Sequence, residues 1–187
     1  SFMHRYSETT REVAQDGRRG ALMLTIDIDH PDAEKFIVAK DDLTKITGAN
    51  ISVKVTDEFM QAVKDDTEFS LKNGIKVKAK KVWQKITEQA WKNGEPGVLF
   101  WDTVLKESPA DCYTEQGFKT ITTNPCSELP LNYFDSCRLA SLNLFAYVDN
   151  PFTFHATVNV NKLQEHAVKA QRIMDDIVDL EEEKINS

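Results

Sequence analysis

This 187-residue chain has few cysteines, no long apolar run and no excess of basic residues. Its 3 cysteines are an odd number that does not make a disulfide framework, and they suit a reducing compartment such as the cytoplasm, where we expect the protein to reside. No apolar run approaches the roughly 18 residues that a membrane-spanning helix needs, and the first residues lack the layout of a signal peptide. These absences exclude a membrane protein and argue against secretion.

The shortage of basic residues also excludes a class of partner. Lys and Arg number 23 against 30 Asp and Glu, which gives a formal net charge of −7. Such a surface repels phosphate backbones, so we do not expect non-specific binding to nucleic acid. Glycine and proline are few, at 7 and 6, beside 41% hydrophobic residues, so the chain is neither disordered nor of low complexity. What remains is a globular protein of about one domain.

The N-terminal half alternates between helical and strand patterns. Apolar residues at helical spacing predict helices at 7–17, 32–40, 56–66 and 77–92. Short apolar or alternating runs predict strands at 21–28, 50–55 and 97–101. The first of these strands is nearly continuously apolar and is therefore expected to be buried on both faces. The alternation predicts an α/β fold with a mostly parallel sheet and helices on its outer faces.

Single residues mark the expected ends of several helices. Ser7 and Thr56 are each placed to accept a hydrogen bond from the first turn of a helix. Gly17 suits a left-handed stop. In the last predicted helix, 161–185, Asn161 and Gln164 resemble a capping box and precede an apolar stripe. A further strand is expected in the sequence LASLNL, residues 139–144.

The most unusual local chemistry is the sequence Asn124-Pro125-Cys126-Ser127-Glu128. If this segment is extended, residues two apart project to the same side about 6–7 Å from one another, so an amide, a thiol and a carboxylate face one small molecule. Pro125 lacks the amide hydrogen that a central strand needs and favours an extended loop presented into a cavity. The alternative is an ordinary loop with a buried thiol and a capping Asn124, because free cysteine is commonly a small core residue.

The other candidates carry weaker signals. Cys137 precedes Arg138, a cation that favours the thiolate, but Cys137 also suits a core position at the start of the strand 139–144. Cys112 receives no role, and the scattered histidines and cysteines lack the spacing of a metal site. The turn from Gly17 to Gly20 carries Arg18 and Arg19, which suit a phosphate or a base edge, or else are solvated surface charges.

Several segments together resemble a known family, the catalytic subunit of ribonucleotide reductase. TTNPCSELPL (122–131) and DSCRLASLNL (135–144) resemble its active-site finger loop and the strand that follows, and DGRRGALMLTIDIDHPD (16–32) resembles its second specificity loop and the next strand. The resemblance continues through GANISVKVTDEFM (48–60), AWKNGEPGVLFWDT (90–103) and AQRIMDDIVDLE (170–181). It covers nearly the whole chain and is nearest to the adenosylcobalamin-dependent class.

The resemblance implies a role for each candidate residue. Cys126 matches the cysteine that becomes a thiyl radical and removes the 3′-hydrogen of the ribose, Glu128 the base for the 3′-hydroxyl proton, and Asn124 the amide that binds the sugar hydroxyls. Cys137 matches one half of the dithiol that reduces the substrate. Arg18 or Arg19, with Gly20, match the loop that relays effector identity to the substrate base.

The resemblance also implies that the chain is one piece of a longer enzyme. Residues 1–187 match a single partial domain of a ten-stranded α/β barrel, with helices outside the strands and a central finger loop at about 121–131 that carries Cys126. The partner of Cys137, the substrate phosphate loop and the cobalamin-contacting elements have no match here, so the isolated chain is expected to be inactive and to bind no cofactor. The parent's expected partners are ribonucleoside di- or triphosphates, nucleotide effectors and a thioredoxin-like reductant.

Two other functions compete with this one. The chain would be a non-catalytic nucleotide-binding or assembly domain if it kept the barrel strands and lost the chemistry. A thiol oxidoreductase using Cys126 and Cys137 is disfavoured because neither lies in a Cys-x-x-Cys motif at a helix start. Whether the barrel is catalytic or not, an excised part of it leaves strand edges and apolar faces uncovered, so we expect the isolated chain to self-associate.

Overall fold

The computed structural model describes residues 2–13, 17 and 20–185. It divides into two compact units, residues 1–136 and 137–187. We describe each unit by itself. No helix among the described residues is long and apolar enough to cross a membrane.

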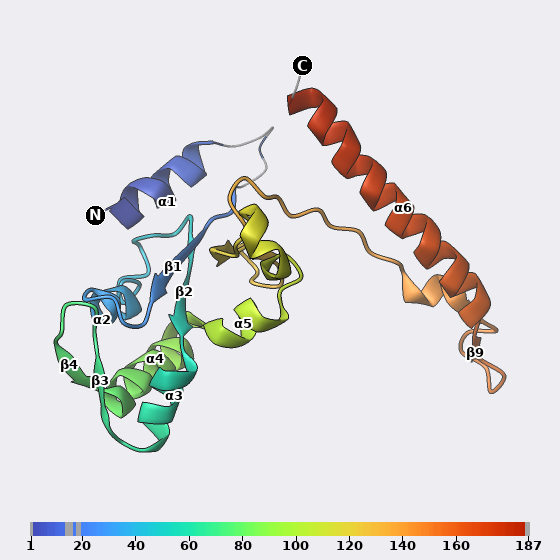
Figure 1. The fold of residues 1–187 in the computed structure, drawn as a ribbon. Helices are drawn as coiled ribbons and strands as arrows, with labels where there is room; N and C mark the ends of the chain where they lie inside the picture. Colours follow the sequence, from blue (N-terminus) through green and yellow to red (C-terminus); the bar gives the residue numbers. More distant parts are fainter. Residues whose placement is uncertain (1, 14–16, 18–19, 186–187) are drawn as a thin grey trace. The chain divides into compact units, whose positions relative to one another are not determined.

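The first unit is built on a three-stranded parallel sheet (Figure 1). The strands are β1 (Met23–Asp27), β2 (Asn50–Val55) and β5 (Gly97–Phe100), in the order β1-β2-β5. The predicted α/β class and the parallel sheet are therefore confirmed. Within the described residues these strands form an open sheet and not a closed barrel.

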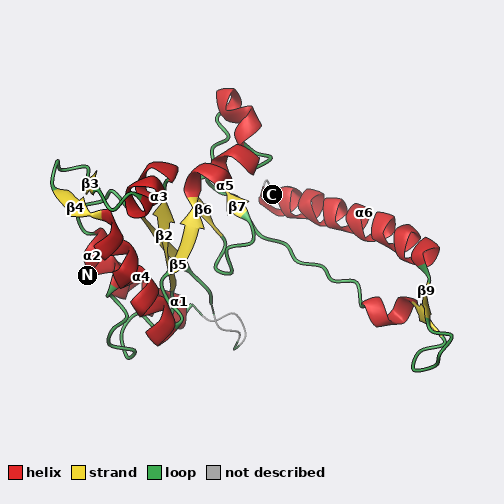
Figure 2. Cartoon of the chain, turned by 90° about the horizontal axis from the view of Figure 1, so that it is seen from below, coloured by secondary structure: helices red, strands yellow, loops and turns green. Residues whose placement is uncertain are grey.

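Three helices cover one face of this sheet (Figure 2). They are α2 (Ala33–Ile37), α3 (Asp57–Lys64) and α4 (Ala79–Asn93). The alternating residues of β2 determine which face the helices cover. Ile51, Val53 and Val55 all point into the core on that face and are at most 1% exposed. Their main partners from the helices are Phe36, Ile37, Phe59, Ala79, Val82 and Ile86. Burial of these apolar side chains is the main force that holds the unit together.

The opposite face of the sheet is largely polar. Asn50, Ser52 and Lys54 alternate with the core residues of β2 and therefore project away from the helices. In the parallel register, Thr25 lies beside Ser52 and Gly97 lies on its other side. A Cβ at Gly97 would stand 2.6 Å from the Ser52 hydroxyl oxygen, so a larger residue there would require the Ser52 side chain to move.

Several elements of the first unit differ from the predictions. Helix α1 spans Phe2–Glu12, so Ser7 lies in its middle, where it is buried and its Oγ accepts a hydrogen bond from Gly48 N at 2.8 Å instead of capping the helix. The strand β1 is half-buried along its length and not buried on both faces, because it is the edge strand of this sheet. Residues 14–16 of the predicted first helix lie outside the described residues.

Two further differences follow from tertiary pairing. Strand β3 (Glu68–Ser70) pairs with β4 (Lys76–Lys78) as an antiparallel hairpin, so Val77 lies in a strand and not in the helix predicted there. Trp101 begins helix α5 (Trp101–Glu107) and does not end β5. A 3-10 helix, η1 (Asp111–Gln116), then leads to two short strands, β6 (Thr122–Thr123) and β7 (Pro130–Leu131). In contrast, Thr56 caps α3 as predicted, since its side chain accepts a hydrogen bond from Phe59 N.

The second unit is dominated by a long helix, α6 (Val160–Ile185). Asn159 caps it by accepting a hydrogen bond from Lys162 N, so the predicted capping box at Asn161 and Gln164 is wrong. Before it lie η2 (Leu144–Tyr147) and the paired strands β8 (Val148–Asp149) and β9 (Thr157–Val158). Residues 139–143 have no strand partner among the described residues and are irregular, so the strand predicted at 139–144 is also wrong.

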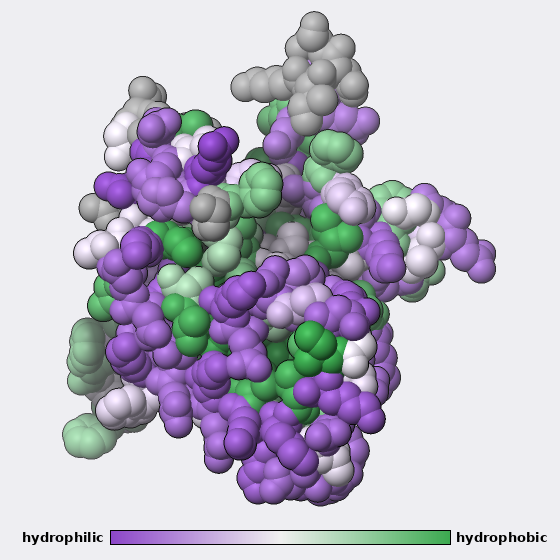
Figure 3. All heavy atoms as spheres, turned by 90° about the vertical axis from the view of Figure 1, so that its left-hand side faces the viewer, coloured by the Kyte–Doolittle hydropathy of each residue, from purple (hydrophilic) through white to green (hydrophobic). Residues whose placement is uncertain are grey.

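The surface of the molecule is mainly hydrophilic when viewed as in Figure 3, with hydrophobic side chains gathered in recesses between hydrophilic ones. Large hydrophobic side chains are nevertheless exposed in both units. On α6 they include Ile173, Ile177, Val178 and Leu180, each at least 40% exposed. The predicted apolar stripe therefore exists, but it is not covered within its own unit.

Candidate active site

The thiol of Cys126 stands at the tip of a short hairpin formed by residues 121–131, which we call the Cys126 hairpin. Its base is the antiparallel pair β6 and β7, with Thr122 opposite Leu131 and Thr123 opposite Pro130. Two further backbone hydrogen bonds frame the pair, from Ile121 N to Leu131 O at 3.0 Å and from Asn124 N to Leu129 O at 3.1 Å. The backbone therefore closes on itself on both sides of the tip.

The tip is a tight turn, and the prediction of an extended segment is wrong. Ser127 N donates to Asn124 O at 3.0 Å, which closes a four-residue turn with Pro125 in its second position. Proline fits there because its ring presets the backbone angle that this position needs. Ser127 follows with a φ of 70°, in the left-handed region. Because the chain reverses here, the argument that alternate residues share one side does not hold.

Asn124 is the structural centre of the turn. It is only 4% exposed, and its side-chain oxygen accepts a hydrogen bond from Leu129 N at 3.0 Å. One residue thus braces the loop through its backbone and its side chain. The alternative prediction of a capping Asn124 is borne out by this contact, whereas its companion, a buried thiol, is wrong because Cys126 is exposed. Glu128 is exposed as well.

The hairpin lies against the polar face of the sheet through three side chains that the sequence analysis did not single out. Asn50 Nδ2 donates to Pro125 O at 2.7 Å, and Lys54 Nζ donates to Ile121 O. Thr25 Oγ1 and Thr122 Oγ1 lie 3.4 Å apart. The alternating sequence NISVKV (50–55) indicates that Asn50 and Lys54 face away from the core, where they are available for such contacts.

A group of charges surrounds Lys54 at the base of the hairpin. The Lys54 ammonium lies 4.1 Å from the centre of the Trp101 ring and 3.8 Å from Asp27 Oδ1. Burial lowers the pKa of Lys54, although the charge of Asp27 opposes this. Burial also disfavours ionisation of Asp27, but the hydrogen bond from Lys72 and the charges of Lys54 and Lys72 outweigh it and hold the pKa of Asp27 below its usual value.

The remaining predicted site residues lie elsewhere. Cys137 begins the second unit, and Arg138, expected to favour its thiolate, forms an ion pair with Glu181 of α6. Arg18 and Arg19 lie outside the described residues. Gly20 packs closely on α1, since a Cβ there would stand 2.6 Å from Thr10 O.

Cys112 is exposed and donates its thiol hydrogen to Pro109 O at 3.0 Å. Across the described part of the chain, no group of three or more His, Cys, Asp or Glu side chains is arranged to hold a metal ion.

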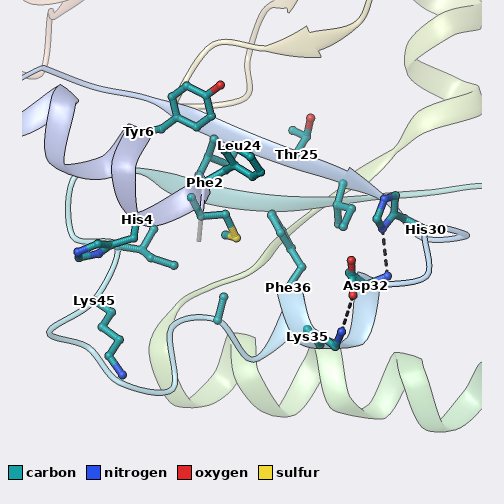
Figure 4. A pocket seen from close by; sticks show the side chains of 14 residues that line it. Phe2, His4, Tyr6, Leu24, Thr25, His30, Asp32, Lys35, Phe36 and Lys45 are labelled. Carbon is teal, nitrogen blue, oxygen red and sulfur yellow. Dashed lines mark hydrogen bonds and ion pairs between the residues drawn. The ribbon is translucent and has the colours of Figure 1, made fainter.

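Another cavity lies away from this hairpin, between α1, β1 and α2 (Figure 4). It measures about 860 Å³ and is lined mainly by apolar side chains, among them Phe2, Leu24 and Phe36. Its charged groups pair locally, because the Lys35 ammonium lies 2.7 Å from Asp32 Oδ1 and Asp32 N donates to His30 Nδ1. A smaller cavity of about 620 Å³ adjoins the Cys126 hairpin at Leu129 and Pro130.

Comparison with known proteins identifies relatives along the whole chain. The family model described as ribonucleotide reductase, barrel domain, matches residues 1–187. A vitamin B12-dependent ribonucleoside-diphosphate reductase of Thermoplasma acidophilum is 35% identical, over 96% of this chain and 23% of that protein.

Two bacterial proteins are similar to the same degree. A vitamin B12-dependent ribonucleoside-diphosphate reductase of Mycobacterium tuberculosis is 32% identical, over 96% of this chain and 26% of its own length. A vitamin B12-dependent ribonucleotide reductase of Streptomyces coelicolor is 33% identical, over 79% of this chain and 18% of its own length. The chain thus spans 18–26% of the length of these three relatives.

Proposed function

The chain belongs to the ribonucleotide reductase family, within the barrel domain, and from this membership we propose that it forms part of the catalytic barrel of an enzyme that reduces ribonucleotides to deoxyribonucleotides by thiyl-radical chemistry. The observation that carries the proposal is the placement of Cys126, exposed at the tip of a braced turn over the polar face of a parallel sheet. The sheet is then one part of a ten-stranded barrel, and residues 121–131 are its central finger loop.

Cys126 is the proposed radical residue. Its thiol gives up a hydrogen atom to become a thiyl radical, takes the 3′-hydrogen from the ribose, and returns a hydrogen to that carbon at the end of the reaction. Such a thiol must be accessible to the substrate and held in one place. Cys126 meets the first condition by its exposure, and the hydrogen bonds of its turn support the second.

Glu128 and Asn124 are proposed to act on the sugar hydroxyls. Glu128 follows the turn and is exposed, so its carboxylate is accessible to take the 3′-hydroxyl proton. Asn124 is proposed to orient the sugar in addition to its contact with Leu129 N. Departure of the 2′-hydroxyl as water then requires two electrons from a dithiol, for which we propose Cys137 and a cysteine of the parent polypeptide other than Cys112.

Adenosylcobalamin is the proposed radical source, in keeping with the vitamin B12-dependent relatives. When bound, it supplies the radical that oxidises a cysteine thiol. The chain's own contribution is an accessible thiol, and the exposed Cys126 fits that need. Holding the cofactor is left to other parts of the parent enzyme.

Ribonucleoside diphosphates are the proposed substrates, because the relatives from Thermoplasma acidophilum and Mycobacterium tuberculosis carry that activity in their names. Nucleotide effectors are proposed to act through Arg18 or Arg19 with Gly20. The close packing of Gly20 on Thr10 supports a loop whose end is fixed to α1. A thioredoxin-like protein is the proposed reductant, and the cytoplasm the proposed location.

Replacement of Cys126 in the full-length enzyme tests the proposal directly. Cys126→Ser is expected to abolish formation of deoxynucleotide from ribonucleotide, because a serine hydroxyl does not yield a hydrogen atom under these conditions. The matched control is Cys112→Ser, which alters another exposed cysteine and should keep turnover near that of the unaltered enzyme. Appreciable turnover by Cys126→Ser would overturn the proposed radical role of Cys126. A full-length protein that forms no deoxynucleotide even without a replacement would favour a non-catalytic role for the barrel.

A further inference from the structure

Two hydrogen bonds join β2 to the Cys126 hairpin, and their spacing is the same on both segments. Asn50 contacts Pro125 and Lys54 contacts Ile121. The two donors are four positions apart on β2, and the two acceptors are four positions apart on the hairpin, in the reverse order. The segment 121–125 therefore runs antiparallel to β2 across its polar face, over about 13 Å.

The contact from Asn50 acts on the peptide unit that carries the catalytic thiol. Pro125 C=O and Cys126 N belong to one planar peptide, so a hydrogen bond to Pro125 O fixes the orientation of the group bonded to Cys126 Cα. The turn itself does not need this contact. Ser127 N and Leu129 N close it through Asn124, so without Asn50 the turn still forms, but its tip is no longer tied to the sheet and these hydrogen bonds open more often.

The contact from Lys54 acts at the other end of the segment. Its side chain is only 13% exposed, so its ammonium is held among Ile121 O, Asp27 and the Trp101 ring. A buried ammonium needs such partners, because an unsatisfied one is costly. Lys54 thereby fixes where the hairpin leaves the sheet, while Asn50 fixes where its tip lies.

We propose that Asn50 and Lys54 are positioning residues for the reaction at Cys126, which hold the thiol at one height and in one orientation over the polar face of the sheet. This inference rests on the proposed radical role of Cys126. Neither residue is proposed to touch substrate. Their effect comes through the geometry of the turn, and displacement of a reacting group by about 1 Å costs on the order of 100-fold in rate.

The decisive variant is Asn50→Asp in the full-length enzyme. It keeps the shape of the side chain, removes the N–H donor and sets a carboxylate against Pro125 O. We expect kcat to fall about 10- to 100-fold with a much smaller change in KM, because the turn carries the reacting groups, whereas binding of the substrate phosphates is assigned to other parts of the parent enzyme. The control is Asn73→Asp, the same chemical change in the β3–β4 turn, where the oxygen that accepts from Ile75 N is retained. It should leave both constants unchanged.

Hydrogen exchange of the turn provides a readout that does not depend on catalysis. In Asn50→Asp the amide hydrogens of Ser127 and Leu129 should exchange faster than in the unaltered enzyme, while those of the β2 core residues should not change. Lys54→Met, which keeps the aliphatic stem, should raise exchange at Ile121 instead. Unchanged exchange at the turn in Asn50→Asp would overturn the inference, as would faster exchange with an unchanged kcat or a loss confined to KM.

The two proposals fail in different ways. If Cys126→Ser retains turnover, the proposed radical role of Cys126 is wrong, whatever Asn50→Asp does to exchange. If Cys126→Ser is inactive but Asn50→Asp matches the unaltered enzyme in kcat and exchange, the radical role stands and the positioning role is wrong.

Discussion

Ile51 N donates a hydrogen bond to Glu95 Oε1 at 2.8 Å, although the two residues are 44 positions apart. Strand β5 begins only at Gly97, which pairs with Ser52, so the carboxylate of Glu95 extends the hydrogen bonding of β2 beyond the end of its neighbouring strand. Its other oxygen pairs with Lys40, whose ammonium also donates to Ala49 O. One side chain therefore ties the start of the central strand to the segment after α2.

Replacement of this carboxylate should destabilise the first unit. Glu95→Ala leaves Ile51 N and the Lys40 ammonium without their charged partner, and hydrogen bonds to charged groups contribute about 1.5–3 kcal/mol. We expect the free energy of unfolding, measured by urea denaturation at fixed protein concentration, to fall by about 2 kcal/mol. Glu88→Ala, at an exposed position of α4, should stay within about 0.5 kcal/mol. Equal effects of both would show that the contact with Ile51 is unimportant.

The close approach of α1 to the 45–49 segment predicts a contrast between two glycines. A Cβ at Gly48 would stand 2.3 Å from Ser7 O, so Gly48→Ala must push α1 away and break the hydrogen bond to Ser7 Oγ. Overpacking of this kind costs about 1–3 kcal/mol, and loss of the hydrogen bond adds about 1 kcal/mol. Gly74→Ala has nothing within 4 Å and meets only the strain of a φ of 81°, which costs an alanine about 1–2 kcal/mol.

Thermal unfolding followed by circular dichroism compares the two glycine variants. A lower Tm for Gly48→Ala than for Gly74→Ala is expected. A Gly48→Ala variant that melts with the unaltered chain would mean that α1 does not pack on this segment.

The lowered pKa of Asp27 predicts a stability term that acid removes. Its carboxylate is favoured in the folded state by Lys72 and Lys54, so this term is complete above the usual pKa of 3.8 and is lost as pH falls through the lower folded value. Asp27 is half exposed, so we expect Asp27→Asn to lose less than about 1 kcal/mol at pH ~7 and to match the unaltered chain at pH ~2. Urea denaturation at both pH values measures this, and a difference that grows in acid would contradict it.

The sequence was a good guide wherever local chemistry and tertiary packing agree. Strand β2 has the predicted bounds because its branched residues alternate with polar ones, and Thr56 caps α3 because the cap is made three residues away. The cap predicted at Ser7 is wrong because the partner of its side chain, Gly48, is 41 positions distant. The helix predicted to begin at Val77 begins later because a three-residue strand carries too little pattern to outweigh the helical run that follows.

The candidate site was predictable in its residue types but not in its shape. The amino-acid sequence around Cys126 is sufficient to identify the motif. The turn depends on Ser127 bonding back to Asn124, and its placement depends on Asn50, which is 75 positions from Pro125. No local sequence pattern predicts the contact between Asn50 and Pro125. The alternating polar residues of β2 did show that the second face of the sheet is not core, and this was the available clue.

The proposed base, Glu128, predicts a specific loss. Glu128→Gln in the full-length enzyme keeps the size of the side chain but removes the proton acceptor, and positioned acid–base groups contribute about 10²- to 10⁴-fold. We expect kcat to fall within that range while substrate affinity changes little. Glu107→Gln, an exposed acid at the end of α5, is the control and should be neutral. A Glu128→Gln enzyme with normal kcat would remove this residue from the mechanism.

The exposed apolar side of α6 predicts that the isolated chain self-associates. Ile173, Ile177, Val178 and Leu180 lie uncovered along a helix of 26 residues, and contiguous apolar surface of this kind favours association in water. Light scattering coupled to size exclusion should therefore show species larger than 21.3 kDa.

Ile173→Glu combined with Ile177→Lys should shift the chain toward the monomer, because each places a charge in the middle of the apolar side. The control pair, Glu165→Lys with Lys169→Glu, exchanges charges that already pair on the same helix and should leave the distribution unchanged. An unaltered chain that is monomeric across the accessible concentration range would show that the apolar side of α6 does not drive association.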